Sequence, residues 1–274
     1  MLDAYFKRLI TDTTELRCTS LLAILDKMGA SYHVDKEKVG QRKAINIRVP
    51  LHNNVMPYIL IGAHYDSPPD SSGANDNVAG LSVLLGILRV FHFITKQKRR
   101  PIPLEFVFFD MGEDEMIGSS AYTQHIHENQ IYAMLNLDLC GVGDTVLLAA
   151  GDHVPNTPVD RALRKLNESP HKSSLRVIEM LPPGDDYYFN RIGVATVSIC
   201  IVPEDDIVPI VGVAVSMHNN EHIAILPSVF ETIHNRALDK PEVVDIDAMR
   251  QVMLVVNNLI SNLFLTMPEG MDWR

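Results

Sequence analysis

Apolar residues recur along the chain at two spacings, one typical of strands and one typical of helices. Buried strands are predicted where short apolar runs occur, at residues 58–63, 104–110, 133–139, 146–150 and 194–201, with weaker β-like runs at 31–35 and 44–49. Helices are predicted where apolar positions recur every three or four residues, at 2–10, 14–28, 77–94, 119–127, 158–167, 184–191, 227–236 and 246–267. Gly29 is a predicted helix C-cap, and residues 201–215 are predicted to form a loop.

The alternation of strands and helices predicts an α/β fold in which a mixed, mostly parallel twisted sheet lies between helices. No internal repeat or linker-like segment interrupts the 274 residues, so the sequence favours one domain, with the helices and short strands of residues 1–50 packed on it. The helix at 77–94 is apolar nearly all round, which indicates burial in the core. Its residues 78–94 are expected to be too short, and too interrupted by Arg89 and His92, to span a bilayer.

Composition and charge argue against several classes of partner. The net charge is −10, and the densest basic stretch, residues 96–100, is expected to be a solvated loop, so nucleic acid is not an expected partner. The three cysteines form no C-x-x-C pair, which is typical of reduced thiols. The first residues include acidic side chains and lack the apolar core of a signal peptide. A cytoplasmic protein without a membrane partner is therefore expected, and the oligomeric state is left open.

Four short segments and a late histidine carry residues that can bind metal. The candidate ligands are His64, Asp76, Glu113, Asp138 and His218. Two imidazoles and three carboxylates suit a pair of zinc ions that share one carboxylate. Asp66 lies two residues after His64, at a strand end, so it can face the same way and accept a hydrogen bond from the imidazole.

Most of these residues have an ordinary structural explanation when each is taken alone. Asp76 stands at the start of a predicted helix, where aspartate is a typical N-cap, and the acidic run at 113–115 is typical of a solvated loop. Asp138 differs, because an aspartate in so apolar a run is costly to bury unpaired. His218 and His222 are four residues apart but lack the adjacent glutamate of the zincin motif.

Taken in order, the segments AHYDS, GANDNVAG, an acidic loop before GSSAY, NLD and a late histidine resemble the co-catalytic zinc aminopeptidases of peptidase clan MH. That group includes bacterial leucyl aminopeptidases and, as relatives, glutaminyl cyclases. The resemblance covers residues 58–227 and implies a zinc-exopeptidase fold, a three-layer sandwich. It further implies a metal-dependent aminopeptidase that uses a water activated by two zinc ions to remove N-terminal residues from short peptides.

The resemblance also assigns roles to individual residues. Asp76 would bridge the two Zn²⁺ ions, His64 and Asp138 would bind one ion, and Glu113 and His218 would bind the other, with Asp66 orienting His64. A cis peptide is implied between Asp76 and Asn77. Residues 184–199 resemble a further family segment, so Asp185 is a candidate for substrate binding, as are the hydroxyls of Tyr187 and Tyr188.

The chain departs from the family at residue 112, where the family has the glutamate that acts as general base. Counting forward from FFD and backward from GSSAY places Gly112 at that position and Glu113 at the metal ligand. General acid–base catalysis is typically worth about 10²–10⁴-fold, so the loss is serious.

Three hypotheses follow from this departure. In the first, Glu115 or Asp114 replaces the missing base. In the second, the loop is shifted by one residue, so that Glu113 is the base and Asp114 the ligand. In the third, the protein binds metal or peptide ends without turnover. A glutaminyl cyclase is a further alternative, although that chemistry also uses the missing acid.

Overall fold

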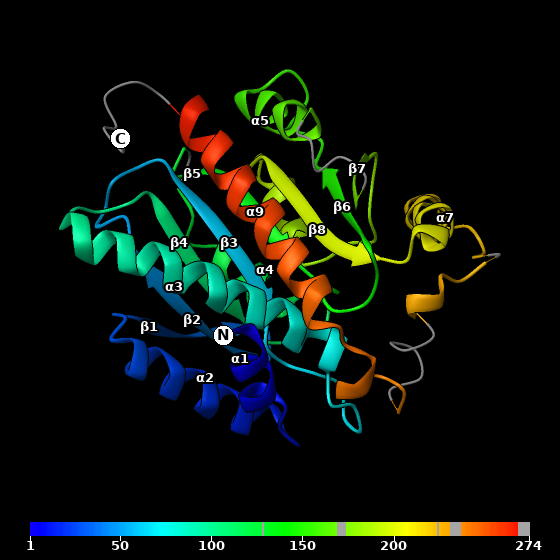
Figure 1. Cartoon of the computed structure of the whole chain (residues 1–274), viewed down its shortest axis with the longest axis horizontal. Helices are drawn as coiled ribbons and strands as arrows, with labels where there is room; N and C mark the ends of the chain where they lie inside the picture. The colour runs from blue at the N-terminus through cyan, green and yellow to red at the C-terminus, as the bar shows by residue number, and fades with distance from the viewer. Residues whose placement is uncertain (128, 169–173, 224, 231–236, 268–274) are drawn as a thin grey trace.

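A computed structural model of the chain describes residues 1–127, 129–168, 174–223, 225–230 and 237–267. Within these residues, eight strands form one sheet in the order β1-β2-β4-β3-β5-β8-β6-β7 (Figure 1). The strands are β1 (His33–Val39), β2 (Arg42–Pro50), β3 (Tyr58–His64), β4 (Leu104–Phe109), β5 (Ile131–Leu137), β6 (Thr145–Ala150), β7 (Leu175–Ile178) and β8 (Thr196–Val202).

The four central strands, β4, β3, β5 and β8, are parallel to one another. Strand β2 pairs antiparallel with β4, and β6 pairs antiparallel with β8, so both outer parts of the sheet change direction. The prediction of a mixed, mostly parallel sheet is therefore confirmed. Because parallel strands end at the same edge, the loops that follow β3, β4 and β5 meet there.

Helices cover both faces of the sheet (Figure 1). One face carries α1 (Leu2–Leu9), α3 (Gly80–Lys98) and α9 (Ile246–Thr266), which contact one another, with α2 (Thr14–Met28) beside α1 and α5 (Pro158–Asn167) against α9. The opposite face carries α4 (Ile117–Thr123) and α6 (Asp186–Arg191). A kinked turn, η1 (Ala74–Ala79), with non-helical backbone at Asp76 and Asn77, leads into α3. Short 3-10 turns occupy Glu204–Asp206 and Pro241–Val243.

Burial on both faces explains why the central strands are apolar without interruption. In β3, Ile59 and Ile61 point into the larger core beneath α3, whereas Tyr58 and Leu60 point into a second cluster with Phe189 of α6. Alternate residues of a strand face opposite sides of the sheet, so a strand covered on both sides needs apolar residues at every position.

Several element predictions are confirmed, and others are corrected. Gly29 has a positive φ of 67° and closes α2 as predicted. The predicted loop at 201–215 is wrong, because helix α7 (Ile207–Asn219) begins there. This stretch is apolar on all sides, so it lacks the alternation that identifies a surface helix. Strand β7 was not predicted, and residues 231–236 of the helix predicted at 227–236 lie outside the described part of the chain.

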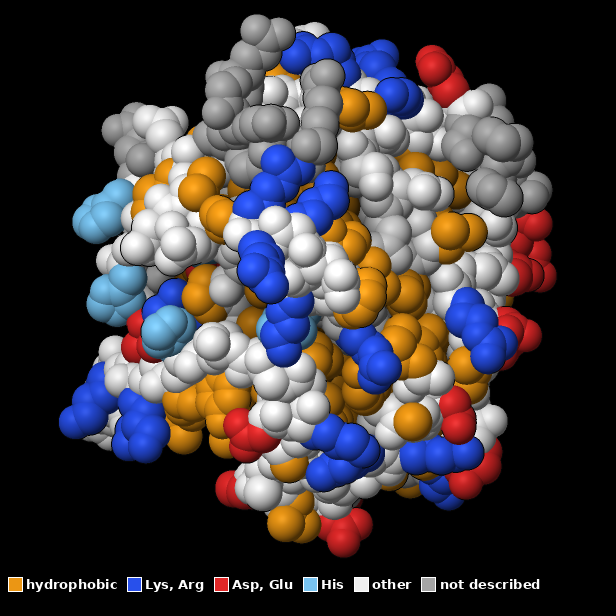
Figure 2. Space-filling model, turned by 60° about the vertical axis from the view of Figure 1, so that its left-hand side comes forward, with side chains coloured by type: hydrophobic (Ala, Val, Ile, Leu, Met, Phe, Trp, Pro, Cys, Tyr) orange, Lys and Arg blue, Asp and Glu red, His pale blue; other side chains and the backbone are white. Residues whose placement is uncertain are grey.

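The expectation that the most apolar helix is too short to span a bilayer is wrong. Residues Ala74–Lys98, which are α3 and the kinked turn before it, span 25 residues and are long and apolar enough to cross a membrane by length and composition. In the fold, 67% of its most apolar window is buried, as expected of a core helix. On the face shown in Figure 2, several Lys and Arg side chains follow one another down the middle of the view, next to apolar side chains.

Candidate metal centre

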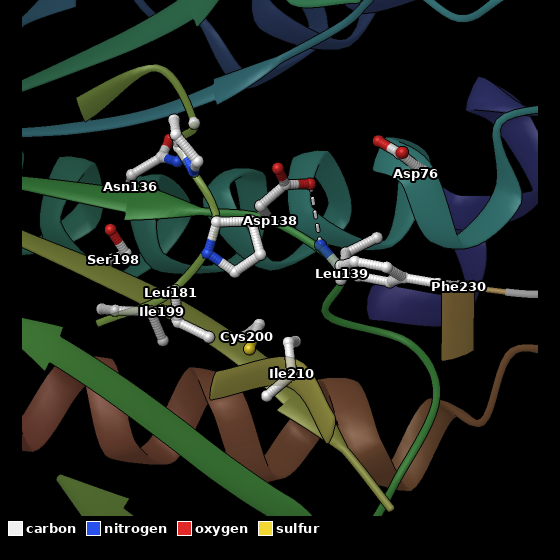
Figure 3. A pocket seen from close by; sticks show the side chains of 13 residues that line it. Asp76, Asn136, Asp138, Leu139, Leu181, Ser198, Ile199, Cys200, Ile210 and Phe230 are labelled. Atoms are coloured by element: carbon white, nitrogen blue, oxygen red, sulfur yellow. Dashed lines mark hydrogen bonds between the residues drawn. The ribbon is translucent and has the colours of Figure 1, made fainter. Parts of the chain in front are cut away.

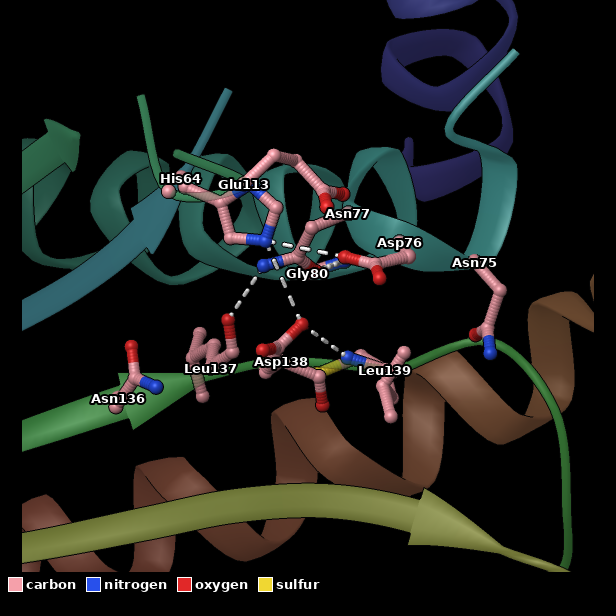
Figure 4. A network of polar contacts seen from close by, with 12 residues as sticks. His64, Asn75, Asp76, Asn77, Gly80, Glu113, Asn136, Leu137, Asp138 and Leu139 are labelled. Carbon is pink, nitrogen blue, oxygen red and sulfur yellow. Dashed lines mark hydrogen bonds and ion pairs between the residues drawn. The ribbon is translucent and has the colours of Figure 1, made fainter. Parts of the chain in front are cut away.

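The loops that follow β3, β4 and β5 bring an imidazole and several carboxylates together (Figure 4). His64, Asp76 and Glu113 each offer a ligand atom within 4.8 Å of the other two. The Nε2 atom of His64 lies 3.1 Å from Oδ1 of Asp76 and 3.7 Å from Oδ1 of Asp138. Imidazole and carboxylate donors are the ligands that zinc takes in catalytic sites, so the donor set fits that metal.

Asp66 ties the first of these loops to the second. Its Oδ1 atom lies 3.2 Å from Nδ1 of His64 and accepts a 2.7 Å hydrogen bond from the backbone N–H of Gly112. Its Oδ2 atom accepts from the N–H of Glu113 at 3.1 Å. Burial would raise the pKa of Asp66, but these hydrogen bonds and the His64 charge lower it below its usual value. The predicted role of Asp66 in orienting His64 therefore has a direct structural basis.

The Asp76 loop is held by the side chains on either side of it. The Nδ2 atom of Asn77 donates to the carbonyl of Leu137, and Oδ1 of Asn75 accepts from the N–H of Gly141. Both contacts fasten the loop to the exit of β5. The peptide between Asp76 and Asn77 is cis, as the sequence resemblance implied.

Two charged residues that the sequence analysis did not identify support this loop. The carboxylate of Asp239 accepts hydrogen bonds from the backbone N–H groups of Asn75 (2.7 Å) and Asp76 (3.3 Å). Burial raises the pKa of Asp239 to about 6. No simple motif marks Asp239, because its partners are backbone groups more than 160 residues away.

Arg17 of α2 is the second of these residues, and its side chain is fully buried. Its guanidinium donates to three backbone carbonyls, those of Leu9 (3.1 Å), Tyr65 (3.1 Å) and Ser72 (2.7 Å). It thereby joins the N-terminal helices to the loops that carry His64 and Asp76. Burial lowers its pKa to about 10, so it stays protonated at neutral pH. Its place on the buried face of α2, among leucines, was a signal available in the sequence.

Crowding of negative charge shifts the pKa values of the cluster. Desolvation of the Glu113 carboxylate and repulsion from the nearby charge of Asp76 together raise the pKa of Glu113 to about 8. Burial also raises the pKa of Asp76. Burial alone would lower the pKa of His64, but its contacts with the surrounding aspartates hold that pKa well above the usual value. A bound cation would relieve this repulsion, which supports a metal centre.

Packing explains the glycine at position 112. A Cβ atom on Gly112 would lie 2.4 Å from Cγ and 2.5 Å from Cβ of His64. The loop therefore passes directly against the imidazole, and a side chain at 112 requires His64 or the loop to move. Glu113 lies in the cluster with His64 and Asp76. This agrees with the alignment in which Gly112 takes the position of the base and Glu113 that of the ligand.

The other two acidic residues of this loop, Asp114 and Glu115, lie near Arg42. The carboxylate of Asp114 lies 2.7 Å from Arg42, and that of Glu115 lies 3.7 Å from the same guanidinium. The Glu115 side chain is 83% exposed. The shifted hypothesis required Asp114 as a ligand, and its pairing with Arg42 places its carboxylate elsewhere.

The arrangement does not bring every predicted site residue to the cluster. His218 lies at the exposed C-terminal end of α7 and does not line the cavities described below. The hydroxyl of Tyr187 accepts from Arg191 on its own helix, and that of Tyr188 donates to the carbonyl of Glu115. Neither tyrosine lines those cavities.

Two neighbouring cavities surround the cluster. The polar one has a volume of about 280 Å³. It is lined by His64, Asp76, Gly112, Glu113, Glu115, Met116, Asp138, Pro183, Gly184 and Asp185. The other, of about 170 Å³, shares Asp76 and Asp138 with it and is mainly apolar (Figure 3). Its apolar wall includes Leu139, Leu181, Ile199, Ile210 and Phe230.

Comparison with known proteins gives a consistent picture. A family model described as Peptidase family M28 matches residues 46–259. Aminopeptidase YwaD of Bacillus subtilis is 35% identical over 106 residues, which are 38% of this chain and 21% of that protein. A vacuolar membrane protease of Candida glabrata is 32% identical over 115 residues, which are 42% of this chain and 12% of that protein.

Solved structures share the fold. The zinc aminopeptidase BSAP from Bacillus subtilis matches 80% of this chain and 49% of its own, with a TM-score of 0.58 and 22% identity. The glutaminyl cyclase of Macrostomum lignano matches 97% of this chain and 89% of its own, with a TM-score of 0.67 and 18% identity. The predicted fold class is therefore confirmed.

The pKa shifts predict that the metal-free protein loses stability as pH rises from about 5 to about 8. Glu113 has an ordinary pKa of 4.5 and a folded-state pKa of about 8, so the folded state holds more protons between these values. The raised pKa of His64 acts in the same direction. Urea unfolding at several pH values, after chelation, measures the effect. Glu113→Gln should flatten the slope, and a metal-free protein that becomes more stable toward pH 8 would contradict the prediction.

Replacing Arg17 should weaken both the fold and metal binding. Arg17→Met leaves two buried carbonyls and one partly buried carbonyl without their donor, at about 1–3 kcal/mol for each buried one, so a loss of about 3 kcal/mol is expected. Arg17→Lys keeps the charge and should lose less. Zinc affinity should fall about 10–100-fold, as for other groups that hold ligands in place. Urea unfolding and competition with a chromophoric chelator measure the two effects. The exposed Arg8→Met is the matched control, and equal values for both methionine variants would refute this role.

Proposed function

The chain belongs to peptidase family M28, and on that premise we propose that it is a metal-dependent aminopeptidase that removes an apolar first residue from short peptides. The observation that carries the proposal is the pairing of the cluster of His64, Asp76 and Glu113 with an apolar cavity that shares Asp76. The matched segments cover 12% and 21% of the lengths of the two curated relatives. The substrate and the cytoplasmic location are therefore parts of this proposal.

Two zinc ions are proposed, with Asp76 shared between them. His64 and Asp138 would hold one ion, and Glu113 with a second imidazole would hold the other. Zinc in such a site makes water more acidic and polarises the carbonyl group of the substrate. The protein itself keeps His64 in one orientation through Asp66, and holds the Asp76 loop through Arg17 and Asp239.

The apolar cavity supports a preference for the first side chain of the substrate. Leu181, Ile210 and Phe230 surround a space that adjoins the carboxylates of Asp76 and Asp138. A scissile carbonyl placed at the metal cluster would direct the first side chain toward this space. Each methylene buried in such a pocket is worth about 1–3 kcal/mol of discrimination, so leucine should be favoured over alanine.

The second imidazole was predicted to be His218, which lies at the exposed end of α7, so we consider the other histidines of the chain as its source. Two histidines, His171 and His234, lie outside the described residues. His234 is five residues before Asp239, whose carboxylate contacts the backbone of Asp76, and five residues span at most about 17 Å. We therefore propose His234 as the remaining zinc ligand.

The aminopeptidase proposal predicts turnover that depends on metal. Leucyl-anilide substrates should be cleaved faster than alanyl ones by about tenfold or more in kcat/KM, and far faster than aspartyl ones. Chelation should abolish the activity and Zn²⁺ should restore it. Ile210→Phe narrows the pocket and should reduce the preference for leucine, whereas Val208→Phe on the exposed side of the same helix should not.

Other outcomes of this assay separate the alternatives. Conversion of peptides with an N-terminal glutamine to pyroglutamate and ammonia, without cleavage, would support a glutaminyl cyclase. That fold is among the similar structures. Full metal occupancy without turnover of any substrate would support a binding protein.

The ligand proposal predicts that His234→Ala lowers zinc from two ions to one per chain, while His218→Ala leaves two. Zinc content after dialysis, measured on the purified variants, tests this. Melting temperatures of the chelated proteins serve as the control for folding. Loss of zinc from His218→Ala, with two ions retained in His234→Ala, would refute the assignment.

A further inference from the structure

Two carboxylates that line the polar cavity, Glu115 and Asp185, are not among the proposed ligands, and of these two Asp185 is the buried one. Asp185 stands at the N-cap position of α6 without a side-chain capping hydrogen bond, and it lines the same cavity as His64 and Glu113. Asp185 is only 2% exposed, and its Oδ1 atom has no hydrogen-bond partner among the described residues. A buried carboxylate oxygen left unpaired costs about 1–3 kcal/mol or more, so its presence calls for an explanation.

The acidic loop after β4 does not supply the base that the family uses. At Gly112 the space beside the backbone is filled by the His64 ring. Asp114 and Glu115 are directed toward Arg42, and Glu115 is largely in solvent. A base acting on the attacking water must border the cavity and keep an acceptor oxygen available. Glu115 also borders the cavity, but its side chain is largely in solvent beside Arg42, whereas Asp185 is buried in the cavity wall with an unpaired oxygen.

We infer that Asp185 is the general base of this protein, in place of the missing glutamate; the inference rests on the proposed aminopeptidase function. The attacking water transfers a proton to the Asp185 carboxylate as its oxygen bonds to the scissile carbonyl carbon. Protonated Asp185 then gives this proton to the amide nitrogen as the carbon–nitrogen bond breaks. The released amine leaves and the carboxylate is regenerated, so protons and electron pairs balance.

The environment of Asp185 suits this role. Its carboxylate lies in the wall of the cavity that holds the ligand cluster, and its Oδ1 atom has no hydrogen-bond partner among the described residues. The neighbouring Asp186 is partly buried, and its carboxylate accepts hydrogen bonds from Ser198 at 2.6 Å and from Asn136 at 3.4 Å, so both of its oxygens have partners.

A rival role for Asp185 is to bind the ammonium group of the substrate. The two roles differ in the kinetic constant that they control. Loss of a base lowers kcat, whereas loss of a binding contact that is equal in the ground and transition states raises KM and leaves kcat unchanged.

The test compares Asp185→Asn with Glu115→Gln in the zinc-loaded protein, using a leucyl-anilide substrate. We expect Asp185→Asn to keep its zinc content and to change KM less than threefold, while kcat falls about 10²–10⁴-fold. A raised KM with normal kcat, loss of zinc from Asp185→Asn, or a fall of kcat in Glu115→Gln alone would overturn the inference.

A second variant tests the inference even if Asp185→Asn does not fold. Asp185→Ala opens space at the base, so added sodium formate should restore part of kcat in this variant and leave the original protein unaffected. Absence of rescue in folded, zinc-loaded Asp185→Ala counts against the base. If the original protein is active and Asp185→Asn is equally active, the inference is refuted but the proposed function is not. If the original protein is inactive on all substrates, both are refuted.

Discussion

Mutual repulsion among carboxylates at one edge of the sheet is the constraint on which the rest of this structure depends. Asp66, Asp76, Glu113 and Asp138 gather around a single buried imidazole, because the parallel strands β3, β4 and β5 end together. Such a cluster is costly without positive charge. His64 and the buried guanidinium behind the loops supply part of that charge, and a bound metal would supply the remainder.

The same close packing accounts for the unusual residue in the loop after β4. Asp66 binds the N–H groups of Gly112 and Glu113, which draws this loop against the ring of His64. Only a residue without a side chain fits at that distance. The glycine is thus part of how His64 and Glu113 are positioned, and the proposed base is a carboxylate on another wall of the cavity.

Much of the fold could be predicted from periodicity alone, since the central strands are buried on both faces and read as unbroken apolar runs. Helix α7 was missed because an apolar stretch without alternation carries no period, and β7 because four residues are too few to show one. His64, Asp76 and Glu113 were recognised from ordered motifs, whereas His218 was chosen only for its late position in the sequence.

By itself, the sequence determined the family, the α/β class and the residues that form the ligand cluster, because these depend on local runs and short motifs. Only the tertiary structure decided how Arg17 and Asp239 hold the loops, why position 112 is glycine, and which buried carboxylate of the cavity has an oxygen without a partner among the described residues. These are contacts between segments far apart in the chain. Their geometry is set by how the sheet and helices pack, and no local pattern records it.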